Sequence, residues 1–282
     1  MASSVSFTLT PQPPVNQEWI SPEEQLERLS LYIAKKISDV SGLIFPIAHL
    51  VAKYGEIDDS AMEWHRALVI LAQTNPKVFP QKIPPLPTDI FEILYSRCLI
   101  SRDKKKPDGT FFKIKESHVL SLILEEFGTL AQLEKDILKP FGEANYPQNE
   151  NPFHFRSFEN LCGNQQTAPM RTHWVLMSKD VLPGTKGKGY RRQEALVDSL
   201  SRKSLVAYRI PTLLQTFATF AIHKIATGES LYSDGNVSTY TRVTDLSRRN
   251  GMMSFGGSAP SGVCTQDFLT GDDLGAAVLR YV

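Results

Sequence analysis

The sequence predicts an α+β protein, in which an N-terminal helical bundle is followed by a mixed α/β domain. Three observations predict it: helix signals fill the first half, a loop-rich segment follows, and the second half combines strands with helices before several short strands. Because strands and helices do not alternate regularly, a parallel βαβ sheet is not expected. The predicted parts are a disordered N-terminus, a helical domain, a loop-rich boundary and an α+β domain with C-terminal display loops, over residues 1–20, 21–140, 141–169 and 170–282.

Helices are predicted in the first half from cap residues and from the spacing of apolar side chains. Ser21 is followed three residues later by Glu24, which is the pattern of a capping box. Apolar residues then recur at intervals of three and four, so that they share one face of a helix. The five prolines of residues 75–87 predict an extended connector, and Pro140 is expected to end the last helix. The predicted helices span residues 21–40, 43–54, 60–73, 88–99, 116–127 and 129–138.

The second half is predicted to begin with a buried strand over His173–Met177, a short apolar run. A glycine-containing loop over residues 181–189 leads to a helix over residues 190–202 and a short strand over residues 206–210. Proline and glycine then bound an amphipathic helix over residues 211–226. Polar turns separate the remaining strand candidates. These lie at residues 240–243, 252–255, 263 and 276–281.

Composition excludes several classes of protein. The formal net charge of the 282 residues is +1, with −4 in residues 1–150 and +5 in residues 151–282, so no nucleic-acid partner is expected. Three widely spaced cysteines form neither a disulfide framework nor a zinc motif. No apolar run reaches the ~20 residues of a membrane span, and the N-terminus lacks a signal-peptide pattern. A soluble protein is expected, either cytoplasmic or exported by a signal that hydropathy does not reveal; its oligomeric state is not predicted.

Two lysine-containing loops offer contacts for phosphate. Residues 104–109 form a basic turn, which is interpreted either as a solvated loop or as a phosphate-contact or nuclear-localisation segment. Residues 186–189 precede a predicted helix, where glycine amides could bind an anion. The second loop lacks the spacing of a nucleotide-binding P-loop, so a flexible surface loop is the preferred interpretation.

Cys162 and His173 are the candidate residues of an alternative hypothesis, a cysteine-dependent hydrolase or transferase. A thiol nucleophile needs a base oriented towards it, and the sequence does not show whether the two residues meet. The histidines include no zincin-type pair. Asp267, Asp272 and Asp273 are either calcium ligands or, as the irregular spacing favours, solvated loop carboxylates. No catalytic residue, metal site or cofactor is therefore predicted in the preferred interpretation.

Two motifs of the second half resemble a known pattern. Ala207 to Leu213, with Tyr208, Arg209 and Pro211, is similar to a "YRLPTE" start that leads into a helix, and Gly256–Ser258 is similar to the later "GGSW" motif. Gly275 and Arg280 stand in for the final "GFR" motif at a different spacing. Residues 170–282 thereby resemble formylglycine-generating-enzyme-like domains of the C-type-lectin fold. The whole chain resembles uncharacterised proteins of obligate intracellular bacteria.

The resemblance implies a binding function. Oxidase members of the family use a cysteine pair close in sequence, whereas this region holds Cys264 alone, and the calcium motifs of sugar-binding lectins do not occur. The matching branch is non-catalytic and includes the display proteins diversified by retroelements. There the binding residues lie near the C-terminus, just before the closing strand. Whether the two ends of the domain lie side by side, with the loop exposed above them, is the structural observation that tests this expectation. The expected function is a binding protein that presents residues 264–273 to a protein or other ligand. The expected contact residues are Cys264, Thr265, Gln266, Asp267, Phe268 and Asp272.

Overall fold

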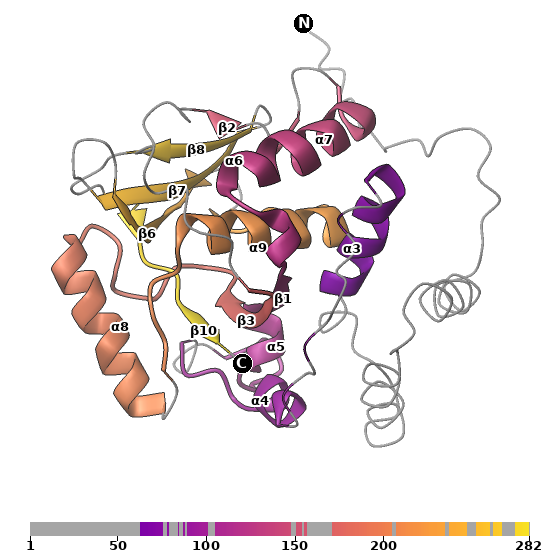
Figure 1. Cartoon of the computed structure of the whole chain (residues 1–282). Helices are drawn as coiled ribbons and strands as arrows, with labels where there is room; N and C mark the ends of the chain where they lie inside the picture. The colour runs from indigo at the N-terminus through magenta and orange to yellow at the C-terminus, as the bar shows by residue number, and fades with distance from the viewer. Residues whose placement is uncertain are drawn as a thin grey trace, which may run out of the picture. The chain divides into compact units, whose positions relative to one another are not determined.

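The computed structural model describes residues 63–75, 78, 84, 87, 89–100, 105–147, 151–153, 155–156, 171–204, 207–234, 237–246, 252–259, 262–266 and 274–281. The chain divides at residues 44/45, and every described residue belongs to the unit 45–282. Helices and sheets mix within this unit, so the predicted α+β class is confirmed (Figure 1). Among the described residues no helix combines the length and the apolar character needed to cross a bilayer. The helices predicted over residues 21–40 and 43–54 lie outside the described residues.

A three-stranded antiparallel sheet joins the two halves of the chain. Strand β3 (His173–Ser178) is central, with β1 (His118–Ile123) on one side and β10 (Leu279–Tyr281) on the other. Leu120 lies opposite Leu176 in the first pair. The buried strand predicted over residues 173–177 is confirmed.

Strand β1 replaces part of the helix predicted over residues 116–127, and that prediction was wrong. All six residues of β1 are buried, because helices pack against it. A fully buried strand has a continuous apolar run, which periodicity does not distinguish from a buried helix. Short helical turns flank it, α5 (Ile114–Ser117) and the 3₁₀ helix η3 (Glu125–Phe127). The predicted helical bundle of residues 21–140 is therefore not all-helical in its described part.

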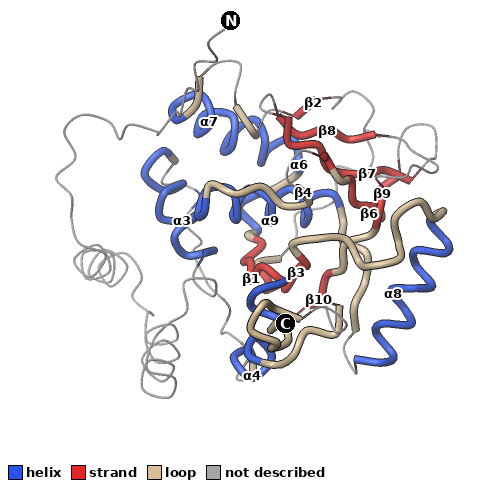
Figure 2. Tube along the Cα trace, turned by 180° about the vertical axis from the view of Figure 1, so that it is seen from behind, coloured by secondary structure: helices blue, strands red, loops and turns tan. Residues whose placement is uncertain are grey.

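The second sheet has five strands, in the order β2-β8-β7-β6-β9. Strand β7 pairs antiparallel with β6 and β8, whereas the outer strands β2 and β9 pair parallel with their neighbours. Both views show it as a group separate from β1, β3 and β10 (Figures 1 and 2). The strands predicted at residues 240–243, 252–255 and 263 are confirmed and are longer than expected. The strand predicted over residues 276–281 is reduced to β10, and within the described part of residues 206–210 only Arg209 forms a bridge, with Leu279, so both of these predictions were too long. The bounds are β2 (Phe155–Arg156), β6 (Tyr240–Leu246), β7 (Met252–Ala259), β8 (Gly262–Gln266) and β9 (Leu274–Gly275), and a separate ladder pairs β4 (Ser233–Asp234) with β5 (Val237–Ser238).

Helix α9 (Leu213–Thr227) packs against both sheets. It begins with a reciprocal capping box, in which Thr212 Oγ1 accepts from the Gln215 N–H at 3.2 Å and Gln215 Oε1 accepts from the Thr212 N–H at 3.0 Å. It ends at Gly228, whose φ of 77° is left-handed, as predicted for a glycine cap. The predicted amphipathic character was wrong: Leu213 to His223 are all buried, because β1, β6, β7 and α3 surround the helix.

Helix α3 (Glu63–Thr74) covers α9. Trp64, Leu68 and Leu71, which the spacing predicts to share one face, are all buried. The Trp64 ring meets the Trp174 ring of β3 edge-on, with the centroids 4.8 Å apart. The predicted helix is therefore confirmed from residue 63 onward.

Helix α4 (Ile90–Tyr95) is shorter than the helix predicted over residues 88–99, and the predicted end was wrong. The chain becomes extended at Ser96, and the Cys98 N–H donates to the Phe112 carbonyl at 2.8 Å. Residues 97–98 thus pair with residues 112–113 instead of continuing the helix. Asp89 occupies the N-cap position.

The helical run after residue 129 continues past Pro140. The predicted capping box of Thr129 and Gln132 is confirmed at the start of α6 (Leu130–Gln132). A π-helical segment, η4 (Leu133–Leu138), leads into α7 (Lys139–Asn145). Pro140 lies within this continuous run, directly after the π-helical segment, so the predicted stop was wrong.

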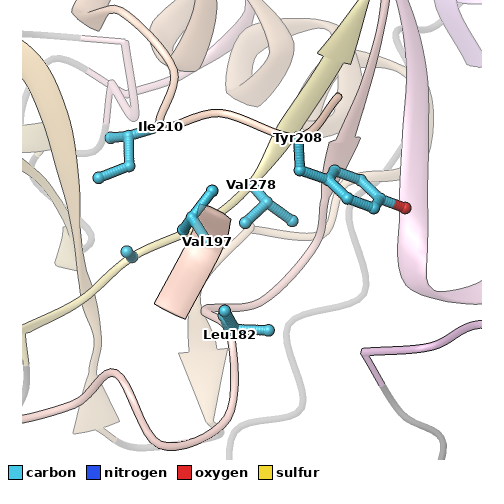
Figure 3. Packing of buried hydrophobic residues seen from close by; sticks show 6 residues of the cluster. Leu182, Val197, Tyr208, Ile210 and Val278 are labelled. Atoms are coloured by element: carbon cyan, nitrogen blue, oxygen red, sulfur yellow. The ribbon is translucent and has the colours of Figure 1, made fainter. Parts of the chain in front are cut away.

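Helix α8 (Tyr190–Ser204) lies on the outside of the molecule, and the predicted helix over residues 190–202 is confirmed (Figure 1). Its predicted inner face was partly wrong, since Ala195 is exposed whereas Gln193 and Val197 are buried. Val197 belongs to a cluster of buried residues from α8 and the loops around it (Figure 3). The cluster comprises Leu182, Val197, Tyr208, Ile210, Ala276 and Val278.

Candidate functional site

The six predicted contact residues divide between a strand and a segment outside the described residues. Cys264, Thr265 and Gln266 form the second half of β8. Asp267, Phe268 and Asp272 lie outside the described residues. The loop predicted over residues 264–273 was therefore too long at its start, because its first three residues pair with β7: Cys264 lies opposite Gly256, and Gln266 lies opposite Ser254.

Residues 267–273 connect strands on opposite sides of the β6–β7 pair. Strand β8 lies beside β7, and the next described strand, β9, lies beside β6, where Leu274 is opposite Tyr240. Adjacent strands are about 4.8 Å apart, so the two ends of this seven-residue segment are separated by about three strand spacings. The segment thus enters and leaves from two fixed positions on one sheet.

Buried hydroxyl groups hold the chain immediately after this segment. Three successive N–H groups donate to them: Ala276 to Thr185 Oγ1 at 3.0 Å, Ala277 to Thr241 Oγ1 at 2.7 Å, and Val278 to Ser178 Oγ at 3.1 Å. Residues 274–279 are all buried. Because a buried N–H must find an acceptor, the three hydroxyls determine the path of this part of the chain.

Two further contacts tighten the same region. A Cβ atom at Gly275 would lie 2.6 Å from Val181 Cβ, so only glycine allows this close approach. The buried Gln193 amide donates to the carbonyls of Leu274 and Thr185 at 3.2 and 3.1 Å. Its oxygen accepts from Nε of the fully buried Arg242, at 3.3 Å. Sequence reasoning missed this polar network, because its members come from four separate segments.

The first motif of the resemblance lies against the C-terminal strand. Arg209 and Leu279 exchange both backbone hydrogen bonds, at 2.9 and 2.8 Å. The Arg209 guanidinium lies 4.3 Å from the centroid of the Tyr281 ring. The start and the end of residues 171–281 are also neighbours, since Val175 of β3 lies opposite Tyr281 of β10. Gly256 and its neighbours in the second motif belong to strand β7.

Of the alternative catalytic pair, Cys162 lies outside the described residues, and His173 begins strand β3. His173 Nδ1 lies 2.6 Å from the Arg171 carbonyl oxygen, and Nε2 lies 3.5 Å from Gln215 Nε2. The ring lies against the Tyr281 ring at a tilt of 31°, with the centroids 5.1 Å apart. The enzyme hypothesis stays a prediction.

A buried ionic cluster joins α3 to α9. Glu63 Oε2 lies 2.7 Å from His223 Nδ1, with both side chains buried. Glu63 Oε1 lies 3.4 Å from Lys179 Nζ. For His223 the sequence left open a partly exposed or a hydrogen-bonded position; it is buried and hydrogen-bonded, and its partner Glu63 was missed. One signal in the sequence could have indicated that Glu63 is buried. It precedes Ala67 and Leu71 at intervals of four residues, which places it on the same buried face of α3.

No group of three or more potential metal ligands occurs among the described residues. Comparisons with protein-family models, with curated proteins and with solved structures found no match.

Proposed function

We propose that the protein is a non-catalytic binding protein whose C-terminal half presents residues 264–273 to a protein ligand. The observation that carries the proposal is the placement of the segment's two ends. Strand β8 enters it from one side of the β6–β7 pair, and β9 receives it on the other. Loops held at both ends by a rigid scaffold are common positions for binding residues.

The order of elements supports a C-type-lectin-like scaffold. Strand β3 is followed by the helices α8 and α9, the short ladder of β4 and β5, the antiparallel strands β6, β7 and β8, and the short strand β9. The last strand, β10, returns to pair with β3. Adjacent domain ends are what the resemblance implies. The first motif of the resemblance also lies against the last strand, because Arg209 pairs with Leu279 of β10.

The chemistry of the segment favours a protein ligand. It combines an aromatic residue, Phe268, with acidic and amide side chains at Asp267, Asp272 and Gln266. An aromatic side chain supplies contact area with few rotatable bonds, and polar side chains supply adaptable hydrogen bonds. In protein interfaces a small number of residues contributes most of the binding energy.

Hydrogen–deuterium exchange followed by alanine scanning tests the proposal. The backbone amides of residues 267–273 should exchange much faster than those of residues 276–278, which donate to buried hydroxyls. Equally slow exchange in both segments would argue against display. Proteins retained from a cell extract by the immobilised chain are then purified, and each affinity is measured by biolayer interferometry.

The alanine variants should identify the contact residues. Phe268→Ala and Asp272→Ala are expected to weaken the interaction by about tenfold or more, the effect typical of an interface hot spot. A matched control is Glu194→Ala on the exposed face of α8. A partner that binds the wild type and the combined Phe268→Ala/Asp272→Ala variant equally would contradict the assignment.

A further inference from the structure

A basic hairpin is built around the end of α4 and the whole of α5 (Figure 1). The name covers residues 95–100 and 105–117. Backbone bridges pair Arg97 with Lys113 and Lys105 with Phe111, around a turn closed by the Gly109 N–H donating to the Lys106 carbonyl at 2.9 Å. The fold thus brings residues from both sides of the turn onto one short ribbon.

One side of the hairpin is anchored in the protein and the other is exposed. Cys98 is buried, and Ile100 packs against the cluster that contains Tyr208. Arg97 and Leu99, at the intervening positions, are exposed. This period of two is that of an extended strand lying on a core, so the outward side chains have a fixed placement.

The cations of the hairpin lie over aromatic rings. The Arg97 guanidinium carbon is 3.3 Å from the centroid of Phe111, and Lys105 Nζ is 5.5 Å from it. Lys113 and Lys115 Nζ lie 5.3 and 4.4 Å from the centroid of Tyr95. A fifth such contact is that of Lys106 Nζ with the Phe112 ring, at 5.9 Å. Cation–π attraction restricts these side chains before any ligand binds.

The acidic residues of the hairpin serve its internal structure. Asp108 Oδ1 accepts from the N–H and hydroxyl of Thr110, and these hydrogen bonds hold the pKa of Asp108 below its usual value. Glu116 accepts from the Lys113 N–H at 2.7 Å and pairs with Lys106. The hairpin has five basic and two acidic residues, a net charge of +3, in a chain whose total is +1. Positive charge is therefore concentrated here.

We infer that the outer face of the basic hairpin binds single-stranded nucleic acid. Phosphates would contact Arg97, Lys105 and Lys113, which are exposed, and bases would stack on the accessible parts of Phe111 and Tyr95, which are half-buried. Basic side chains interleaved with aromatic rings are the combination that single strands require. A stacked guanidinium presents its face to the ring while its N–H donors lie in the plane of the group, suited to a phosphate.

The aromatic rings favour a single strand over a duplex. In a duplex the bases stack on one another, so a protein contacts phosphates and the edges of bases in the grooves. Aromatic side chains of the protein therefore contribute little to duplex binding. An anionic membrane would favour a broad apolar face, whereas Leu99 is the exposed large aliphatic residue among the described part of the hairpin. The inference uses none of residues 264–273, so it does not depend on the proposed function.

Fluorescence anisotropy of a labelled 20-nucleotide oligouridylate RNA with the full chain tests the inference. Binding should weaken as KCl rises from 50 to 200 mM, with a log–log slope of about −2 for three phosphate contacts. The variant Arg97→Ala/Lys105→Ala/Lys113→Ala should bind at least tenfold more weakly and lose most of this slope. Phe111→Leu should weaken binding severalfold and keep the slope, since it removes a stacking ring of about 1–3 kcal/mol and no charge.

A matched variant on α8 controls for total charge. Arg191→Ala/Arg202→Ala/Lys203→Ala removes three exposed cations from a helix elsewhere on the protein. It should bind within twofold of the wild type, and circular dichroism should show that all variants are folded. Equal losses in the two triple variants would overturn the inference, as would equal affinity for a duplex of the same length. Binding to phosphatidylserine vesicles without binding to the RNA would overturn it in favour of a membrane surface.

Discussion

At the scale of single residues, His118 is a titratable group enclosed by the protein. Its Nδ1 lies 2.9 Å from Ser117 Oγ, and its ring stacks on Tyr208 with the centroids 6.1 Å apart. Among the described residues Nε2 has no hydrogen-bond partner. Burial lowers the pKa of His118 to about 4, and the charge of Lys179 lowers it further while a backbone hydrogen bond at Ile114 opposes the shift. The imidazole is therefore neutral in the folded protein at neutral pH.

This pKa predicts a loss of stability in acid. In the unfolded chain His118 takes up a proton near the ordinary histidine pKa of 6.5, whereas in the folded protein it does so only near 4. Stability is thus retained above pH 6.5 and is lost as the pH falls from 6.5 to 4. Between pH 7 and pH 4.5 the free energy of unfolding should fall by about 2–3 kcal/mol from this residue. The measurement is urea unfolding of the wild type and of His118→Phe at both pH values. Between pH 7 and pH 4.5 the free energy of unfolding of the variant should fall by less than that of the wild type, and the difference should be the contribution of His118.

The effect of His118 on stability can be distinguished from the effects of other titratable groups. Burial also lowers the pKa of His65 to about 4, and its contribution remains in the variant. An identical pH dependence of the wild type and His118→Phe would mean that folded His118 already carries a proton at pH 5. The sequence indicated neither histidine as buried, because burial of His118 depends on β1 being a strand.

At the scale of elements, the close approach of β6 to β7 depends on Gly256. A Cβ atom there would lie 2.5 Å from the Thr239 carbonyl oxygen and 2.8 Å from Tyr240 Cα. Both are backbone atoms, so a side-chain rotation cannot relieve the overlap. Gly256 lies opposite Tyr240 and Cys264, at the centre of the sheet that leads into residues 267–273.

Gly256→Ala should therefore destabilise the protein. Overpacking at a fixed site typically costs about 1–3 kcal/mol, and the absence of a movable side chain places this case at the upper end. Chemical denaturation followed by circular dichroism measures the change. Gly189→Ala is the matched control, because nothing lies within 4 Å of its Cβ position and its φ is compatible with alanine. Equal stability of the two variants would show that the strands can separate at no cost.

The elements that sequence reasoning identified are those with local signals. Thr212 and Gln215 begin α9, and Gly228 ends it, each within a few residues of the feature it determines. Strand β1 had no such signal, since its burial comes from α3, α9 and β3, which are distant in sequence. The same applies to the candidate site: Cys264 was assigned to a loop because its pairing with Gly256 spans a turn rich in glycine and serine. Capping is local chemistry, whereas strand pairing is decided by distant segments.

At the scale of the whole molecule, the described residues on either side of positions 141–169 form one core. Strand β1 completes the sheet of β3 and β10, and Trp64 meets Trp174. Within the intervening segment, Phe153 is buried against Phe141 of α7 and Phe220 of α9, at centroid distances of 5.7 and 6.4 Å. The buried Glu63 carboxylate, on the N-terminal side, faces His223 and Lys179 on the C-terminal side. These contacts run across the boundary predicted between residues 21–140 and 170–282, and whether the two parts fold separately stays a prediction.

Residues 170–282 alone should consequently fail to fold. Without the preceding residues, β3 would lose its pairing along six residues of β1, and α9 would lose the cover of α3. His223 would also lose its hydrogen bond to Glu63, and a buried polar group left without its partner costs about 1–3 kcal/mol, a substantial share of the stability of a typical domain. The fragment should give a poorly dispersed ¹H–¹⁵N spectrum, whereas a fragment of residues 45–282 should give the dispersed signals of the full chain. A dispersed spectrum for residues 170–282, with cooperative urea unfolding, would show instead that β3, α8, α9 and the five-stranded sheet form an independent domain on which the N-terminal elements merely dock.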